Sequence, residues 1–227
     1  MFVGHIAVGL GAKPVAPKTS LGTLVLAAVL LDVLVWAFVV AGLEHIAVKP
    51  GITATNALDL YDYPLSHSLL MSIVWGALMA GGYYAIRKYS RGAWVIFAAV
   101  VSHWILDFAS HRPDMPLAPG IHRYYGLGLY NSRIGMLIVE GALWVIGIVL
   151  YERATRSRRR AGFWVLYLGI AIWSWLWITS LRGAAPNISM VKMGLIDLVL
   201  LAILIAWAYW VEALRVFNER VSAVKKA

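Results

Sequence analysis

The chain has 227 residues, of which 61% are hydrophobic and 14% are charged, with a mean hydropathy of +0.75. Soluble domains carry about 25% charged residues, so this composition excludes an ordinary soluble protein and indicates an integral membrane protein. The formal net charge of +9 fits basic loops beside anionic lipids, and no nucleic-acid partner is expected. The chain contains no cysteine, which excludes disulfides and thiolate metal ligands.

The opening segment, residues 1–12, is apolar but shorter than the roughly 20 residues that span a bilayer. Two prolines and two lysines in "KPVAPK" interrupt it, so we expect a half-helix that dips into the membrane or lies on its surface. A secretory signal peptide is not expected, because Lys13 and Lys18 precede an apolar run that is longer than a signal core and contains Asp32.

Six apolar windows then follow, each with about the length needed to span a bilayer. They are Leu21–Leu43, Pro64–Ile86, Gly92–Phe108, Gly135–Tyr151, Ala161–Leu181 and Met190–Leu214. The sequence therefore predicts an all-α polytopic membrane protein with about six transmembrane helices plus the N-terminal half-helix. No repeat or linker divides the chain, so residues 1–227 are expected to form a single integral membrane domain. Residues 1–134 would carry the candidate site, residues 135–214 three further membrane helices, and residues 215–227 a cytoplasmic tail.

The distribution of lysine and arginine predicts the orientation. Most of these residues lie before the first window, after the second and fourth windows, and after the sixth. Basic loops stay in the cytoplasm, which places both termini there. The two long connections, residues 44–63 and 109–134, are then expected on the extracytoplasmic side.

Ionisable residues inside the apolar windows are costly, about 2.5–3.5 kcal/mol for an aspartate or lysine at a helix centre, so they usually face a cavity, a partner or a metal. They are Asp32, His67, His103, Asp107, Glu140 and Asp197. For any one of them taken alone, a polar contact with another helix is as good an explanation as a catalytic role. Asp197 has no histidine near it in the sequence and is expected to be structural.

The segment "SHWILDFASH" spaces His103, Asp107 and His111 at i, i+4 and i+8. In a helix that extends this far, the three side chains form one stripe. Imidazole and carboxylate together suit Zn²⁺, Mn²⁺ or Fe²⁺, and one stripe cannot complete a site. We therefore expect His67, on the same side of the membrane, to join them.

Two short segments are expected to support this site. Ser66 and Ser68 flank His67 in "YPLSHSLL" and are predicted to hydrogen-bond that histidine or a substrate. The segment "GLGLYNS" lacks the full spacing of a phosphate-binding loop. It is predicted to form a tight turn in which Tyr130 and Asn131 close over the site.

Asp32 raises a geometric problem, because it lies about 16 Å from the outer end of its window. The first spanning helix must tilt or break if Asp32 is to reach the other residues, and His5 meets Asp32 only if the N-terminal half-helix is re-entrant. Asp59, Asp62 and His122 in the outer loops, like His111, are alternative ligands, although loop residues are more often solvated.

The order of these motifs resembles a known family. "GHIAVGLG", Asp32, "LSHSLL", "SHWILD" and "HRPDMPLAPG" resemble, in that order, the bacterial membrane-bound metal-dependent hydrolases of the YdjM-like group, and more distantly zinc-dependent phospholipase C. The resemblance covers residues 1–134 and implies a prokaryotic cytoplasmic-membrane protein. It also implies His5, Asp32, His67, His103 and Asp107 as metal ligands.

Two departures from the family pattern bear on the number of metal ions. The family's Pro-Asp-x-Asp-His block is "LLDVLVW" in this chain, and its His-Arg-Gly-x-Thr block upstream of His67 is "DLYDYPLS". The remaining donors fit one ion better than two.

Three functions follow. The favoured one, chiefly from the resemblance, is a hydrolase with Zn²⁺ (or Mn²⁺ or Fe²⁺) that attacks an ester or phosphoester, including a lipid, from the extracytoplasmic side. Asp32 or Glu140 would act as its general base. The alternatives are an ion- or proton-coupled transporter and a non-catalytic metal-binding membrane protein.

Overall fold

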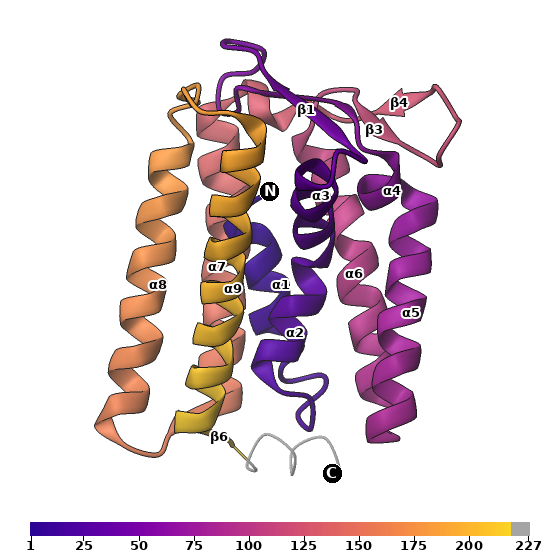
Figure 1. Ribbon diagram of the computed structural model, residues 1–227. Helices are drawn as coiled ribbons and strands as arrows, with labels where there is room; N and C mark the ends of the chain where they lie inside the picture. The colour runs from indigo at the N-terminus through magenta and orange to yellow at the C-terminus, as the bar shows by residue number, and fades with distance from the viewer. Residues whose placement is uncertain (219–227) are drawn as a thin grey trace.

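The computed structural model describes residues 1–218, in which long helices run side by side in one bundle (Figure 1). Five helices are long and apolar enough to cross a membrane: α5 (Leu69–Arg87), α6 (Ser90–Ser110), α7 (Arg133–Ala154), α8 (Arg160–Ser180) and α9 (Met190–Leu214). The pair α2 (Leu21–Ala28) and α3 (Leu30–Val40) forms a sixth span when taken together. These helices confirm the predicted all-α membrane fold with about six spans and a short N-terminal helix.

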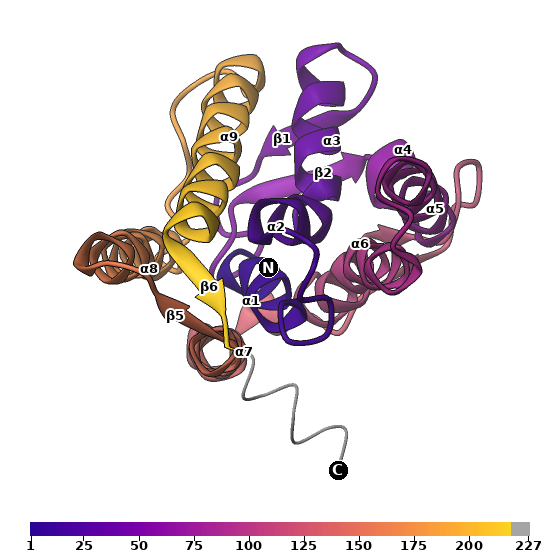
Figure 2. The same cartoon turned by 90° about the horizontal axis from the view of Figure 1, so that it is seen from below.

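The short N-terminal helix α1 (Val3–Ala12) lies in the middle of the bundle and not on its surface. Viewed from below, α1 and α2 are surrounded by the long helices (Figure 2). Val3, Ile6 and Leu10 of α1 are fully buried. The helix packs closely on α7, because a Cβ added at Gly147 would lie 2.6 Å from the carbonyl oxygen of Ala7. The half-helix is therefore a core element that forms a hairpin with α2.

The window Leu21–Leu43, predicted as one helix, is broken. At Val29 the backbone has φ −107° and ψ 12°, and the axes of α2 and α3 differ by 58°. A helix leaves its last four carbonyl groups without partners inside the helix, and the carbonyl of Ala28 instead accepts a hydrogen bond from His103 Nδ1 at 2.8 Å. This bend meets the requirement that the first span must break for Asp32 to reach the other residues.

The window Pro64–Ile86 is also broken, into α4 (Pro64–His67) and α5. Ser68 between them has extended backbone with ψ 152°, and its hydroxyl accepts a hydrogen bond from the backbone N–H of Met71. Ser68 thus caps α5, a role for which serine is among the preferred residues. The break leaves His67 at the end of a short helix of its own.

Short hairpins and turns cover the two ends of the bundle. At one end, β1 (His45–Val48) pairs with β2 (Leu58–Asp62), and β3 (Met115–Pro116) pairs with β4 (Tyr124–Tyr125) near the 3₁₀ turn η1 (Leu129–Asn131) (Figure 1). At the other end, β5 (Thr155–Ser157) pairs with β6 (Arg215–Phe217). The segment expected as a tail thus begins with a paired strand, and its later basic residues, Arg220, Lys225 and Lys226, lie outside the described residues.

The first residues of the chain lie away from the basic end. The amino group of Met1 is buried and contacts the carboxylate of Asp107. Lys13, at the other end of α1, donates to Glu212 at 2.6 Å and to the carbonyl oxygen of Thr19 at 2.9 Å. Lys13, and not Met1, therefore lies with the basic loops.

Candidate metal centre

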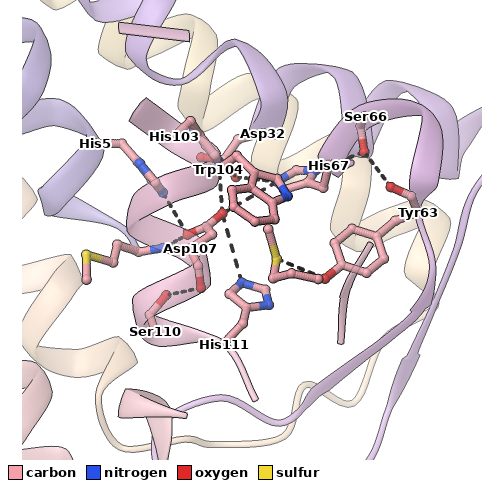
Figure 3. A network of polar contacts seen from close by, with 12 residues as sticks. His5, Asp32, Tyr63, Ser66, His67, His103, Trp104, Asp107, Ser110 and His111 are labelled. Carbon is pink, nitrogen blue, oxygen red and sulfur yellow. Dashed lines mark hydrogen bonds and ion pairs between the residues drawn. The ribbon is translucent and has the colours of Figure 1, made fainter. Parts of the chain in front are cut away.

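A cluster of histidine and aspartate side chains lies inside the bundle (Figure 3). Two of the helices that contribute to it, α3 and α4, lie near the end that carries β1 (Figure 1). It contains all six residues that the sequence analysis proposes as metal ligands: His5 of α1, Asp32 of α3, His67 of α4, His103 and Asp107 of α6, and His111 just after α6. All are buried except Asp32, whose side chain is 31% exposed.

The stripe predicted on α6 is present for two of its three members. His103 Nε2 lies 3.1 Å from Asp107 Oδ2. The helix ends at Ser110, and His111 has extended backbone with ψ 150°, so the condition for a third helical position, a helix that extends this far, is not met. The following Arg112-Pro113 pair disfavours a longer helix. His111 Nε2 nevertheless lies 4.0 Å from Asp107 Oδ2.

The separations between the donor atoms match those around a metal ion. His103 Nε2 is 3.6 Å from Asp32 Oδ1, and His67 Nε2 is 3.9 Å from the same oxygen and 3.7 Å from Asp107 Oδ2. In a tetrahedral site with metal–ligand bonds of about 2.0–2.1 Å, neighbouring donors are about 3.3–3.4 Å apart. A small contraction of the cluster would therefore bring these donors to bonding distance of one ion.

His103 presents a free nitrogen to this centre. Its Nδ1 lies 2.8 Å from the carbonyl of Ala28. A carbonyl only accepts hydrogen bonds, so Nδ1 carries the proton and Nε2 of the neutral ring carries the lone pair. Nε2 is buried without a hydrogen-bond partner among residues 1–218. Asp107 Oδ2, which faces Nε2, is also an acceptor. Two acceptors repel each other at this distance, so either a second proton on the His103 ring or a cation must lie between them.

The tautomer of His67 follows from a chain of hydrogen bonds. Ser66 Oγ donates to Glu44 Oε2 at 2.6 Å, so it accepts from His67 Nδ1 at 2.9 Å. Glu44 Oε1 also accepts from the backbone N–H groups of Leu65 and Ser66 at 2.7 and 2.8 Å. Burial raises the pKa of Glu44, and these hydrogen bonds oppose that rise. His67 Nε2 is left as an acceptor that faces the centre.

His111 is oriented in the same way. Its Nδ1 lies 3.0 Å from Asp114 Oδ1, which leaves Nε2 as the atom nearest to Asp107. The Tyr63 hydroxyl donates to Asp114, and burial together with the charge of Asp114 raises the pKa of Tyr63, so the hydroxyl keeps its proton. Tyr130 packs its ring 5.1 Å from that of His111, in agreement with the expectation that it closes over the site.

The three histidines therefore share one arrangement, in which Nδ1 is held by an acceptor and Nε2 faces the centre. Histidines that bind metals almost always donate their other ring N–H to a carbonyl, a carboxylate or a similar acceptor. Nitrogen and oxygen donors in this combination suit Zn²⁺, Mn²⁺ or Fe²⁺. The residues fit a divalent metal ion.

His5 lies on the other side of Asp107. Its Nε2 is 3.1 Å from Asp107 Oδ1, and its ring stacks on that of His103 with centroids 3.6 Å apart. His5, His103 and Asp107 form one group with metal-ligand spacing, and Asp32, His67 and His103 form another. The partner of His5 is thus Asp107; the contact with Asp32, which the sequence left open, is not formed among the described residues.

Glu140, the other candidate base, lies outside the cluster. Its Oε1 accepts hydrogen bonds from the backbone N–H groups of Phe2 and, at 3.0 Å, Gly4, and its Oε2 accepts from Trp177 Nε1 at 2.7 Å. Oε1 therefore satisfies N–H groups at the N-terminus of α1 that have no helix partners, and Oε2 ties α7 to α8 through Trp177.

The remaining loop candidates lie apart from the cluster. Asp59 pairs with Arg112, Asp62 pairs with His45 at 2.9 Å, and His122 is exposed. Of the four loop residues considered as alternative ligands, His111 alone joins the cluster within the described part of the chain.

Two carboxylates that hold the histidines in place were not proposed from the sequence. Asp114, which accepts from His111, follows it by three residues, and this spacing could have indicated the contact. Glu44 contacts His67 through Ser66, and only the fold brings it there.

A cavity of about 430 Å³ lies beside Asp32. It is lined mainly by apolar and aromatic side chains of α3, α8 and α9, including Trp36, Trp173 and Leu201, and Asp197 also lines it. Asp32 is the partly exposed member of the cluster, so it is the residue that connects the cluster to this space.

Comparisons with protein-family models, with curated proteins and with solved structures found no match to this chain.

Proposed function

We propose that the protein is a membrane-embedded, metal-dependent hydrolase of an ester or phosphoester. The observation that carries this proposal is the common orientation of His67, His103 and His111 around Asp107 Oδ2, with a buried, unpartnered Nε2 on His103. These three histidines, Asp32 and Asp107 would hold the ion, which we take to be Zn²⁺, with Mn²⁺ or Fe²⁺ as alternatives.

A divalent ion in such a site supplies a Lewis acid and lowers the pKa of bound water. The chain itself supplies the base. Asp32 Oδ1 faces His67 and His103, while Oδ2 makes no hydrogen bond within residues 1–218 and the side chain borders the cavity. Asp32 Oδ2 would accept the proton from an attacking water, and burial of His67 and His103 would exclude bulk water from the other side.

The packing below the cluster favours a hydrolase over a transporter. Leu21 and Leu24 of α2 and Leu10 of α1 are fully buried between the cluster and the basic end. These apolar side chains offer no ligand to an ion on a path from the cluster to the basic end. The cluster instead lies next to a cavity that suits an amphiphilic substrate. With basic loops in the cytoplasm of a prokaryotic cell, this cavity would face the extracytoplasmic half of the membrane.

The test is hydrolysis of a panel of carboxylic and phosphoric esters by purified protein before chelation, after chelation, and after return of Zn²⁺, Mn²⁺ or Fe²⁺. We expect chelation to abolish hydrolysis and one metal to restore it. Asp32→Asn should lower the rate about 10²–10⁴-fold, the usual contribution of a general base, whereas Asp62→Asn, at an exposed aspartate outside the cluster, should not. Hydrolysis that survives removal of all metal would contradict the proposal.

A further inference from the structure

The cavity beside Asp32 holds a carboxylate that the proposed chemistry does not use. Asp197 of α9 lines this cavity, yet it makes no hydrogen bond or ion pair within residues 1–218. An unpaired acid at membrane depth is costly and usually marks a functional site. The sequence predicted a structural role for Asp197, but no side chain in the described part of the chain pairs with it.

The other two carboxylates that line the cavity are already engaged. Asp32 faces His67 and His103, and Glu140 accepts hydrogen bonds from Gly4 and Trp177. No lysine, arginine or histidine side chain belongs to the cavity lining. Met1 also lines the cavity, but its amino group is paired with Asp107. A positive charge opposite Asp197 would therefore come from the molecule that occupies the cavity.

The remaining lining suits a cation attached to an apolar chain. Trp36, Trp173 and Tyr130 supply aromatic rings, whose faces attract ammonium groups. Leu200, Leu204 and further leucines and methionines supply apolar surface at the depth of the bilayer.

The same space is bounded by α8 and α9, which pack closely at two glycines of α8. A Cβ added at Gly162 would lie 2.6 Å from the carbonyl oxygen of Leu214, and one at Gly169 would lie 2.0 Å from Trp207. Farther along, toward Thr179 of α8 and Met193 of α9, the two helices line the cavity.

We infer that this cavity binds an amphiphile whose headgroup carries an ammonium group, with Asp197 as the counter-ion. The inference deepens the proposed function, on which it rests, by naming the substrate class as a cationic or zwitterionic lipid-like ester. A purely anionic phosphoester would meet the unpaired carboxylate of Asp197 and would be disfavoured.

Binding can be measured without catalysis. Isothermal titration of the full chain in an uncharged maltoside detergent would compare hexyltrimethylammonium with 1-hexanol, which has the same alkyl length and no charge. We expect the ammonium compound to bind at least about tenfold more tightly than the alcohol, a difference in the range of charge-assisted and cation–π contacts.

Three variants test whether Asp197 causes the preference for the ammonium compound. Asp197→Asn should remove the tenfold preference, Asp197→Glu should keep most of it, and Asp62→Asn should leave it unchanged. Equal affinity for the two probes in the wild type, or an unchanged preference in Asp197→Asn, would overturn the inference.

Metal content measured on the same samples separates this inference from the proposed function. If the protein binds metal but shows no ammonium preference, the cavity inference fails and the hydrolase proposal stands. If it shows a preference that depends on Asp197 but binds no metal, the hydrolase proposal fails and the cavity binds cationic amphiphiles for another purpose.

Discussion

Replacing Ser66 by alanine should weaken metal binding without removing any proposed ligand. Ser66 Oγ accepts from His67 Nδ1 at 2.9 Å and donates to Glu44 at 2.6 Å. Without the hydroxyl, the imidazole loses the contact that fixes its tautomer and its orientation. Loss of a hydrogen-bond partner that orients a metal-binding histidine typically costs about 10–100-fold in metal affinity, which corresponds to about 1.4–2.7 kcal/mol.

The variant should remain folded. Glu44 Oε1 keeps its hydrogen bonds from the backbone N–H groups of Leu65 and position 66. The variant loses two buried hydrogen bonds and leaves Glu44 Oε2 and His67 Nδ1 without this partner, so the expected loss of stability is about 2–4 kcal/mol. Competition against a zinc-binding chelator gives the affinity, and thermal unfolding in detergent gives the stability.

Ser68→Ala is the matched control. Ser68 is equally buried and lies on the other side of His67, but its hydroxyl caps α5 through Met71. Loss of a cap costs about 1 kcal/mol of stability, so Ser68→Ala should lower the unfolding temperature but keep the metal affinity of the wild type, whereas Ser66→Ala should lose metal affinity. The reasoning would be refuted by equal metal affinity in the wild type and Ser66→Ala, or by an equal loss in Ser68→Ala.

Three further predictions concern the frame around the site. Gly147→Ala should destabilise the protein by about 1–3 kcal/mol, because its Cβ would lie 2.6 Å from the carbonyl oxygen of Ala7; an unchanged unfolding temperature would show that α1 is not held this tightly. Glu140→Gln should lower the unfolding temperature but retain bound metal, because Glu140 holds the N-terminus of α1; loss of metal with an unchanged unfolding temperature would contradict this role. Since the chain has no cysteine, single cysteines at Ala118 and Ser157 can report orientation: an impermeant reagent applied from outside should label position 118 and not 157, and the reverse pattern would invert the predicted sidedness.

Much of the fold followed from composition, because six apolar windows of spanning length leave few alternatives. The breaks did not. At Val29 the helix breaks where the carbonyl of Ala28 accepts a hydrogen bond from the distant His103. At Ser68 it breaks because the serine hydroxyl caps a new helix. Periodicity reports the apolar face of a helix but not a bend that a distant side chain stabilises.

The same limit applies to the site. His103 and Asp107 were predictable as a pair, because a spacing of four places them on one face of a helix. His111 joins them from outside the helix, by the path of the backbone after Ser110. The contacts of Glu140 also depend on tertiary structure, because its partners, Gly4 and Trp177, lie far from it in the sequence. Only an arrangement of α1 inside the bundle brings these groups together.

The most direct test of the central claim is the metal content of purified protein after it has been offered Zn²⁺ and washed. The wild type should hold about one ion per chain, and His103→Ala should lose most of it, because a site that loses one of its few protein ligands loses most of its affinity. His122→Ala, at an exposed histidine outside the cluster, should bind as the wild type does. Wild-type protein that binds no transition metal, with His103→Ala reduced only in stability, would show instead that the cluster is a hydrogen-bonded packing contact.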